Sequence, residues 1–216
     1  MTGDDARVAL VETSRRMVRD GLCIGTSGNL SVRAGDDIYV TPSGVQVDDL
    51  VPADICVVDP AGAVRSAPRR VTSELPLHLA VYAASDVAGA VVHTHSPYAT
   101  ALSTVAVELP AIHYTINALG GPVRVAPYAT FGTPELAGHV RRAIDGRFAA
   151  ILANHGTVAY AESLAEAYRR AELLEWLATL YWRACQIGAP AILTEAQLGA
   201  VREQARRTGY GDSLAP

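Results

Sequence analysis

The sequence predicts an α/β protein in which helices cover both faces of one sheet. Three observations favour this class. Helix-like and strand-like segments alternate along the chain, half of the 216 residues are hydrophobic, and no linker-like or charge-rich stretch interrupts them. A chain of this length can bury a sizeable core. We therefore expect a single domain that spans residues 1–216.

The first part of the chain begins with a helix and continues mainly as strands. Val8, Val11 and Val18 recur at helical spacing after two aspartates, and Asp20-Gly21 ends the pattern. The apolar segments that follow are short, and turns rich in Gly, Ser or Pro separate them. We expect strands at the end of 25–33, at 37–41, at 55–59 and near Val64.

The middle of the chain alternates between the two kinds of element. Pro76 stands in the first turn of a helical stretch over 75–85, and the β-branched run 88–95 then predicts a central strand. A helix from Ser96-Pro97 to about Ser103, a strand over 123–127 and a helix from Thr133 through Ile144 are expected next.

The last third is expected to be mostly helical. The apolar run 149–156 predicts one more strand, which ends in a histidine beside a turn. Apolar residues then recur on one face from Ser163 to about Ile187 and predict a long helix. A final helix begins at Thr194 and leads into a Gly-rich tail. The residues on the apolar face of the long helix are Leu164, Tyr168, Ala171, Leu174, Leu177, Ala178 and Tyr181.

The chain contains no lysine, because all 18 of its basic residues are arginine. Schiff-base chemistry needs a lysine amine, so the sequence excludes an imine-forming aldolase and a lysine-anchored pyridoxal-phosphate enzyme. The lysine of a nucleotide-binding P-loop is missing as well.

Charge and cysteine content limit the binding partners and the cellular compartment that the sequence predicts. A net charge of -4 leaves no general basic surface for nucleic acid or anionic lipid, so neither partner is expected. Three scattered cysteines predict free thiols in a reducing compartment. The acidic start MTGDDARVALVE lacks an apolar run, and no stretch is long enough to span a membrane. We expect a cytoplasmic protein.

His93 and His95 stand two residues apart at the end of the predicted strand 88–95. Successive side chains of a strand point to opposite faces, so these two imidazoles project to the same side. His155 ends another apolar strand, and two neighbouring strands could bring the three together. Three such ligands with an open fourth position are typical of catalytic Zn²⁺ sites. Two histidines at an ordinary strand–loop junction remain the alternative.

Glu74 begins the helix predicted at 75–85, where the helix dipole and a nearby cation would both lower its pKa. It could complete a metal shell and detach to act as a base, although a plain first-turn glutamate gives the same pattern. His78 lies one turn later on the same face. We interpret His78 as a buried residue or a support for the ligands.

Three segments of small residues suit an anion such as phosphate: 25–31, 41–44 and 72–73. Each offers hydroxyl groups and backbone N–H groups, and the third lies at a helix N-terminus. Each is also compatible with an ordinary turn. Together they favour a phosphate held by neutral donors, which suits a chain without lysine.

The combined motifs resemble the class II aldolase/adducin family, with order and spacing kept over nearly the whole chain. Within it the pattern is most similar to the bacterial aldolases that act on L-fuculose 1-phosphate. The resemblance implies a three-layer α/β/α sandwich on a largely antiparallel, mixed sheet. The motifs are GTSGNLS (25–31), TPSG (41–44), TSE (72–74), HTH (93–95), HY (113–114), PYATFGT (127–133) and NHG (154–156).

The resemblance also implies an activity and an assembly. Members of this kind bind one Zn²⁺ per subunit and cleave a ketose 1-phosphate, such as L-fuculose 1-phosphate or a 5-deoxypentulose 1-phosphate. The products are dihydroxyacetone phosphate and an aldehyde. The implied assembly is a homotetramer with active sites at subunit boundaries.

Matching positions carry the family's roles onto this chain. The zinc ligands fall on His93, His95 and His155, and Glu74 is both the catalytic acid/base and a further metal ligand. Tyr114 matches a catalytic tyrosine that a neighbouring subunit contributes. The expected phosphate- and substrate-binding residues are Gly28, Asn29, Ser43, Gly44, Thr72, Ser73, the aromatic Phe131 and, in a tail that departs from the usual pattern, Tyr210.

Three other members of the superfamily stay open as alternatives. Sugar-phosphate 4-epimerases share the metal site but typically carry Asp where this chain has Glu74. Methylthioribulose-phosphate dehydratases keep the glutamate. Adducin-like binding modules lack the zinc histidines that this chain has.

Overall fold

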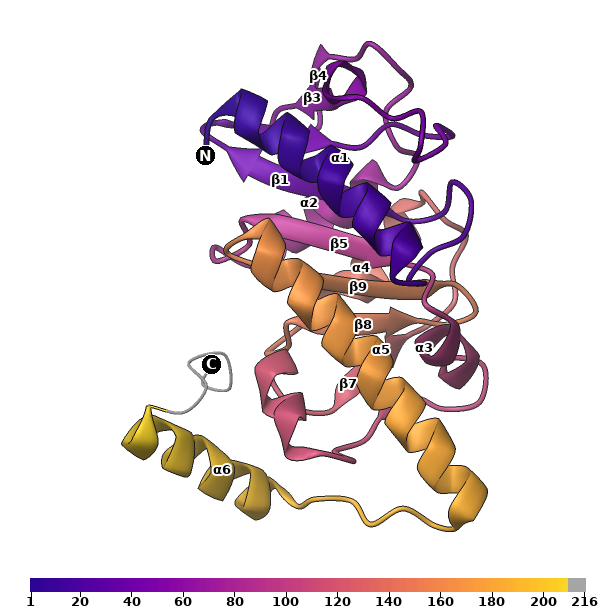
Figure 1. Ribbon diagram of the computed structural model, residues 1–216, viewed down its shortest axis with the longest axis vertical. Helices are drawn as coiled ribbons and strands as arrows, with labels where there is room; N and C mark the ends of the chain where they lie inside the picture. Colours follow the sequence, from indigo (N-terminus) through magenta and orange to yellow (C-terminus); the bar gives the residue numbers. More distant parts are fainter. Residues whose placement is uncertain (210–216) are drawn as a thin grey trace.

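The computed structural model describes residues 1–209, and within that range nine strands form one mixed sheet with helices on both faces (Figure 1). The strands are β1 (Asn29–Ala34), β2 (Asp37–Val40), β3 (Cys56–Val58), β4 (Val64–Ser66), β5 (Ala90–Thr94), β6 (Glu108–Leu109), β7 (Val123–Ala126), β8 (Ala149–Leu152) and β9 (Gly156–Ala161). The helices are α1 (Gly3–Arg19), α2 (Leu75–Ala84), α3 (Pro97–Leu102), α4 (Pro134–Ala143), α5 (Leu164–Ile187) and α6 (Glu195–Thr208), with the 3₁₀ helices η1 (Pro52–Asp54) and η2 (Tyr114–Leu119).

The sheet is largely antiparallel, as the family resemblance implied. Its strand order is β4-β3-β2-β1-β5-β9-β8-β7-β6, and β7–β8 is the one parallel pair among the described residues. Those two strands flank α4 in the chain, so β7–α4–β8 is a crossover unit of the kind that parallel strands require. The alternation of helices and strands alone would predict parallel pairing in the rest of the sheet as well. That prediction is wrong for the other strand pairs, which are antiparallel.

Two hydrophobic cores lie on the two faces of the sheet. Side chains of α1, α3 and α5 pack on one face, and side chains of α2 and α4 pack on the other. Strand residues alternate between the cores: Ala90 and Val92 join the first, whereas Val91 joins the second. Figure 1 shows α1 and α5 crossing one face and α2 and α4 behind it, which gives the three layers.

The segment 149–161 differs from the sequence prediction. The strand expected over 149–156 ends at Leu152, and His155 stands in the turn that follows it. The next strand, β9, was not predicted, although all six of its residues are buried and it pairs with β5. Its run of Thr, Val and Tyr is typical of a strand and was the available signal. The central neighbour of β5 is therefore β9 and not the strand that precedes His155.

The two C-terminal helices begin where the sequence placed them. The Ser163 side chain accepts a hydrogen bond from the Glu166 backbone and starts α5, and Thr194 with Gln197 forms a capping box at the start of α6. In Figure 1, α6 lies apart from α5. It packs beside η2, and the Asn117 amide of η2 donates a hydrogen bond to the Leu198 carbonyl of α6. All three cysteines are free, as expected. Among the described helices, none is long and apolar enough to cross a membrane.

Candidate active site

Five candidate residues lie together at one end of the central strands. Asn29 on β1 is the register partner of His93 on β5, so their side chains lie next to each other on the face that α2 covers. His95 follows one residue after β5. Glu74 is the N-cap residue of α2, and His155 stands in the turn between β8 and β9. Residues far apart in the sequence therefore meet at one point.

The four residues predicted as metal ligands converge closely. One ligand atom from each of Glu74, His93, His95 and His155 lies within 4.8 Å of the others, so the group could hold a metal ion. The Glu74 Oε2 atom is 3.0 Å from His93 Nε2, and its Oε1 atom is 3.1 Å from His155 Nε2. The three imidazole rings are mutually edge-on, with centroids 4.9 Å apart in each pair. This is the convergence that the strand-end histidines predicted.

The hydrogen bonds of this cluster favour a cation at its centre. His93 Nδ1 lies 2.8 Å from the Thr157 carbonyl oxygen, which can only accept, so Nδ1 carries the proton. A neutral His93 then directs the lone pair of Nε2 at Glu74 Oε2 and at His95 Nε2, which is 3.0 Å away. Such electron-rich atoms repel one another unless a proton or a metal ion lies between them. A carbonyl that orients a ligating histidine is the usual support of a metal site.

One oxygen of Glu74 lacks a well-aligned donor. Oε2 accepts a hydrogen bond of 2.9 Å from the Asn29 amide. Oε1 is buried and accepts no hydrogen bond among the described residues, although His155 Nε2 lies 3.1 Å away. An orphaned carboxylate oxygen beside three imidazoles is a donor set that suits Zn²⁺. The residues present therefore fit the metal that the family resemblance implies.

Burial and charge set the protonation of the cluster. Burial raises the pKa of the Glu74 carboxyl, but a positive charge at His93, as when a proton lies between it and Glu74, and the contacts from His155, His93 and Asn29 outweigh burial and hold that pKa well below its usual range. Burial, reinforced by His93 and His155, lowers the pKa of His95 to about 4. At neutral pH the cluster thus combines a carboxylate with an imidazole in its metal-binding, uncharged form.

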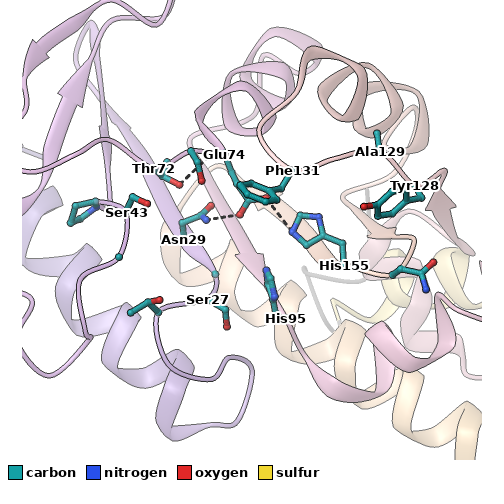
Figure 2. Close-up of a pocket in the computed structure, with 16 residues that line it drawn as sticks. Ser27, Asn29, Ser43, Thr72, Glu74, His95, Tyr128, Ala129, Phe131 and His155 are labelled. Carbon is teal, nitrogen blue, oxygen red and sulfur yellow. Dashed lines mark hydrogen bonds and ion pairs between the residues drawn. The ribbon is translucent and has the colours of Figure 1, made fainter.

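A cavity of ≈ 280 Å³ opens onto Glu74, His95 and His155. The three segments predicted to hold an anion all line it: 26–29, 42–44 and 72–73. In Figure 2, Asn29, Glu74 and His155 point toward one another, with Ser43 and Thr72 on one side of them and Tyr128 on the other. His93 lies fully buried beside this group. A metal site and a polar rim thus share one cavity.

The rim is held in place by hydrogen bonds that involve its backbone. Thr41 Oγ1 accepts a hydrogen bond from the Leu30 N–H, and Ser43 N–H binds the Arg70 carbonyl, which ties the three segments together. Gly28 has a φ of 79°, and a Cβ there would lie 2.3 Å from Cys23 Sγ and 2.9 Å from the His93 carbonyl oxygen. Only glycine fits that position.

Three further residues predicted for the site differ in where they lie relative to the cavity. Phe131 lines the cavity and is largely exposed, as an aromatic wall requires. Tyr114 begins η2, stacks on His113 and does not line the cavity of its own chain. Tyr210 lies outside the described residues.

Tyr128 and Asn154 are among the cavity residues that were not singled out from the sequence. Tyr128 is largely exposed beside the cavity, and Asn154 has a φ of 55°, the one positive value outside glycine among the described residues. The Asn154 N–H binds Ser103 Oγ, which supports the turn that carries His155. Both lie inside motifs that the sequence analysis quoted, 127–133 and 154–156. Their place within those motifs was the available signal.

Replacing Gly156 by alanine is expected to lower the stability of the protein by about 2 kcal/mol or more. An added Cβ would lie 2.2 Å from the Thr94 carbonyl oxygen and 3.3 Å from the His95 ring, so β5 and β9 would have to separate beside two candidate ligands. Denaturant unfolding measures the loss. Gly188→Ala is the matched control, because Gly188 has an extended φ of 168° and no atom within 4 Å of a Cβ. Equal stability of the two variants would contradict the prediction.

Comparison with known proteins assigns the chain to a family. The family described as "Class II Aldolase and Adducin N-terminal domain" matches residues 8–182. The chain is 43% identical over 208 residues to a 5-methylthioribulose-1-phosphate/5-deoxyribulose-1-phosphate aldolase of Rhodospirillum rubrum, covering 96% of this chain and 93% of the relative. It is 38% identical to the L-fuculose phosphate aldolase of Escherichia coli, covering 93% and 94%.

Solved structures agree with the sequence relatives. A structure of an L-fuculose 1-phosphate aldolase superposes with a TM-score of 0.90 at 37% identity, covering 94% of this chain and 96% of that one. The chain is therefore a member of the class II aldolase and adducin family, and within it a lyase of the aldolase class.

Proposed function

We propose that the protein is a zinc-dependent aldolase that cleaves a ketose 1-phosphate to dihydroxyacetone phosphate and an aldehyde. The observation that carries this proposal is the convergence of Glu74 and three histidines on one cavity whose rim is made of hydroxyl groups and glycines. The relatives named above act on L-fuculose phosphate and on 5-deoxyribulose 1-phosphate. We propose the same class of substrate for this chain, a short ketose that carries phosphate on carbon 1.

In this proposal His93, His95 and His155 hold the metal, and Glu74 approaches it when no substrate is bound. A bound Zn²⁺ supplies Lewis acidity, which draws electrons from the substrate carbonyl as the carbon–carbon bond breaks. Because the chain lacks lysine, no imine can take that role. The metal is thus the electron sink that the residue content of this chain allows.

The remaining steps belong to the chain's own side chains. Asn29, Ser43, Gly44, Thr72 and Ser73, with Gly28 shaping the loop, bind the phosphate and thereby fix the reacting carbon beside Glu74. Glu74 lies in the cavity wall beside the three histidines. In the synthetic direction its carboxylate would remove a proton from the carbon that becomes the nucleophile, and in cleavage its protonated form would return that proton to the carbon left by bond breaking. Phe131 and Tyr128 cover the substrate from the other side.

We further propose that the working form is a homotetramer in which Tyr114 of one subunit serves the cavity of its neighbour. One feature supports this. Tyr114 does not line the cavity of its own chain, so a catalytic role for it needs the cavity of a neighbouring subunit. In this arrangement the Tyr114 hydroxyl handles the proton on that oxygen. The same proposal gives Tyr210 the role of closing the site.

Incubation of the zinc-loaded protein with dihydroxyacetone phosphate and a panel of aldehydes is expected to yield ketose 1-phosphates. L-Lactaldehyde would give a six-carbon product and acetaldehyde a five-carbon one, which mass spectrometry distinguishes. In the cleavage direction, dihydroxyacetone phosphate should appear in step with substrate loss. Consumption of a ketose phosphate with no dihydroxyacetone phosphate would contradict the proposal and identify an epimerase or a dehydratase instead.

A further inference from the structure

A line of buried polar side chains runs from Glu74 away from the cavity. On β1, Asn29 and Ser31 share one face because they are two residues apart, and on α2, His78 and Tyr82 follow Glu74 at intervals of four. All four residues beyond Glu74 are buried, and His78 is fully enclosed. The proposed metal site and phosphate rim use Glu74 and Asn29 but leave Ser31, His78 and Tyr82 without a role. Buried polar groups at this density need a reason, because each must be fully hydrogen-bonded.

The contacts form an unbroken chain. Tyr82 Oη lies 2.9 Å from Ser31 Oγ, and Ser31 Oγ lies 2.7 Å from His78 Nδ1. On the other side of the ring, His78 Nε2 lies 2.5 Å from Asn29 Oδ1. The Asn29 amide then donates to Glu74 Oε2 at 2.9 Å. Each link therefore joins a group to the next one toward the carboxylate.

The charge of Glu74 decides the direction of every bond in this chain. A carboxylate accepts only, so the Asn29 NH₂ group must face Glu74 and its oxygen must face His78. His78 then donates from Nε2 and accepts at Nδ1 from the Ser31 hydroxyl, which in turn accepts from Tyr82. The reverse direction would place the Asn29 oxygen against the carboxylate. Burial lowers the pKa of His78 to about 3 and raises the pKa of Tyr82, so the ring stays neutral and the phenol keeps its proton.

Among the described residues, Glu74 and His78 are the two groups whose side chains hydrogen-bond the Asn29 amide, one at each end of it. The two ends of an amide have nearly the same shape, so packing alone does not distinguish them. The proton on His78 Nε2 does, because it can bind only the oxygen end. As a result one oxygen of Glu74 keeps a fixed donor, while Oε1 accepts no aligned hydrogen bond among the described residues.

We propose that His78 is a positioning residue for proton transfer at Glu74. Through Asn29 it holds Oε2 in place and leaves Oε1 as the oxygen that exchanges a proton with the substrate. Ser31 and Tyr82 set the tautomer of His78 that this task needs. The inference rests on the proposed function, since it assigns Glu74 to proton transfer, but the polarity of the chain can be measured without any turnover.

The first test is spectroscopic and uses the intact zinc-loaded protein. Long-range ¹H–¹⁵N correlation spectra report which imidazole nitrogen carries the proton. We expect His78 as the Nε2–H tautomer, and in Ser31→Ala, which removes the donor to Nδ1, we expect this preference to weaken. An Nδ1–H tautomer in the unmodified protein would overturn the proposal, whatever the activity proves to be.

The second test compares His78→Leu with His78→Gln. Glutamine keeps an N–H near the position of Nε2, whereas leucine removes it. The measured rate is exchange of the hydroxymethyl protons of dihydroxyacetone phosphate in D₂O, per folded and zinc-loaded molecule. We expect kcat to fall about 10-fold or more in His78→Leu with little change in KM, and glutamine to restore most of it.

A merely structural role for His78 predicts a different result. Stability would fall in His78→Leu, but kcat per folded molecule would stay at the level of the unmodified protein, and that outcome overturns the proposal. If His78→Leu does not fold, Ser31→Ala takes its place and is expected to lower kcat in the same direction, with an unchanged kcat counting against the proposal. Lack of exchange in the unmodified protein would instead contradict the proposed function, and the tautomer spectrum would still report on the chain.

Discussion

Removal of bound metal is expected to abolish cleavage of the ketose phosphate, and Zn²⁺ is expected to restore it. The donor set explains why. Without a cation the Nε2 atoms of His93 and His95 lie 3.0 Å apart, and the carboxylate of Glu74 lies as close to His93. The absence of lysine leaves no other electron sink for cleavage of the carbon–carbon bond. A loss of more than about 100-fold in kcat is therefore expected, measured by release of dihydroxyacetone phosphate after dialysis against a chelator.

The ligand assignment can be tested apart from the activity. His155→Ala removes one of three nitrogen ligands and is expected to weaken Zn²⁺ binding by about 100-fold or more, because even supporting groups around a metal are worth 10–100-fold. Competition with a chromophoric chelator measures this affinity. His139→Ala is the matched control, since His139 binds the Pro127 carbonyl and lies outside the cluster. Full turnover by metal-free protein, or equal affinity in the two variants, would show that the histidines do not form the catalytic metal site.

Much of this site could be predicted from the sequence because its spacing is local. His93 and His95 share a face by the two-residue period of a strand, and Glu74 falls at a helix start that Pro76 marks. The three segments predicted to bind an anion carry small residues that stand out in an apolar chain. Spacing within one strand or helix sets which side chains share a face, and this does not depend on the rest of the fold.

What the sequence could not supply is the pairing of distant strands. His155 was expected beside His93 through its own strand, but the strand that pairs with β5 is β9, which begins one residue after His155. The partners of His78 were missed for the same reason. It was expected among its helix neighbours, yet it binds Asn29 and Ser31 from β1, some 50 residues earlier in the chain. Register between strands depends on the whole sheet, and periodicity within one segment does not reveal it.

Glu74→Gln is expected to leave Zn²⁺ bound and to slow proton exchange on dihydroxyacetone phosphate by about 10²–10⁴-fold. Glutamine has nearly the shape of glutamate, and its oxygen can still accept the hydrogen bond that Asn29 donates, so the fold around the cluster should persist. The side chain loses its ability to take a proton. The pKa of Glu74 lies well below its usual range, so in the unmodified protein the carboxylate is ionised throughout the neutral range and ready to accept one.

Two comparisons make this result specific: metal binding against proton exchange, and Glu74 against Glu12. Metal content, measured by atomic emission, should match the unmodified protein, because three histidines remain. Glu12→Gln, an exposed position on α1, should exchange protons at the original rate. If Glu74→Gln loses the metal as well, its main role is as a ligand. If the variant keeps both its metal and the original rate of proton exchange, another group transfers the proton. Slow exchange with full metal content is the result that places the base at Glu74, because it separates holding the metal from moving the proton.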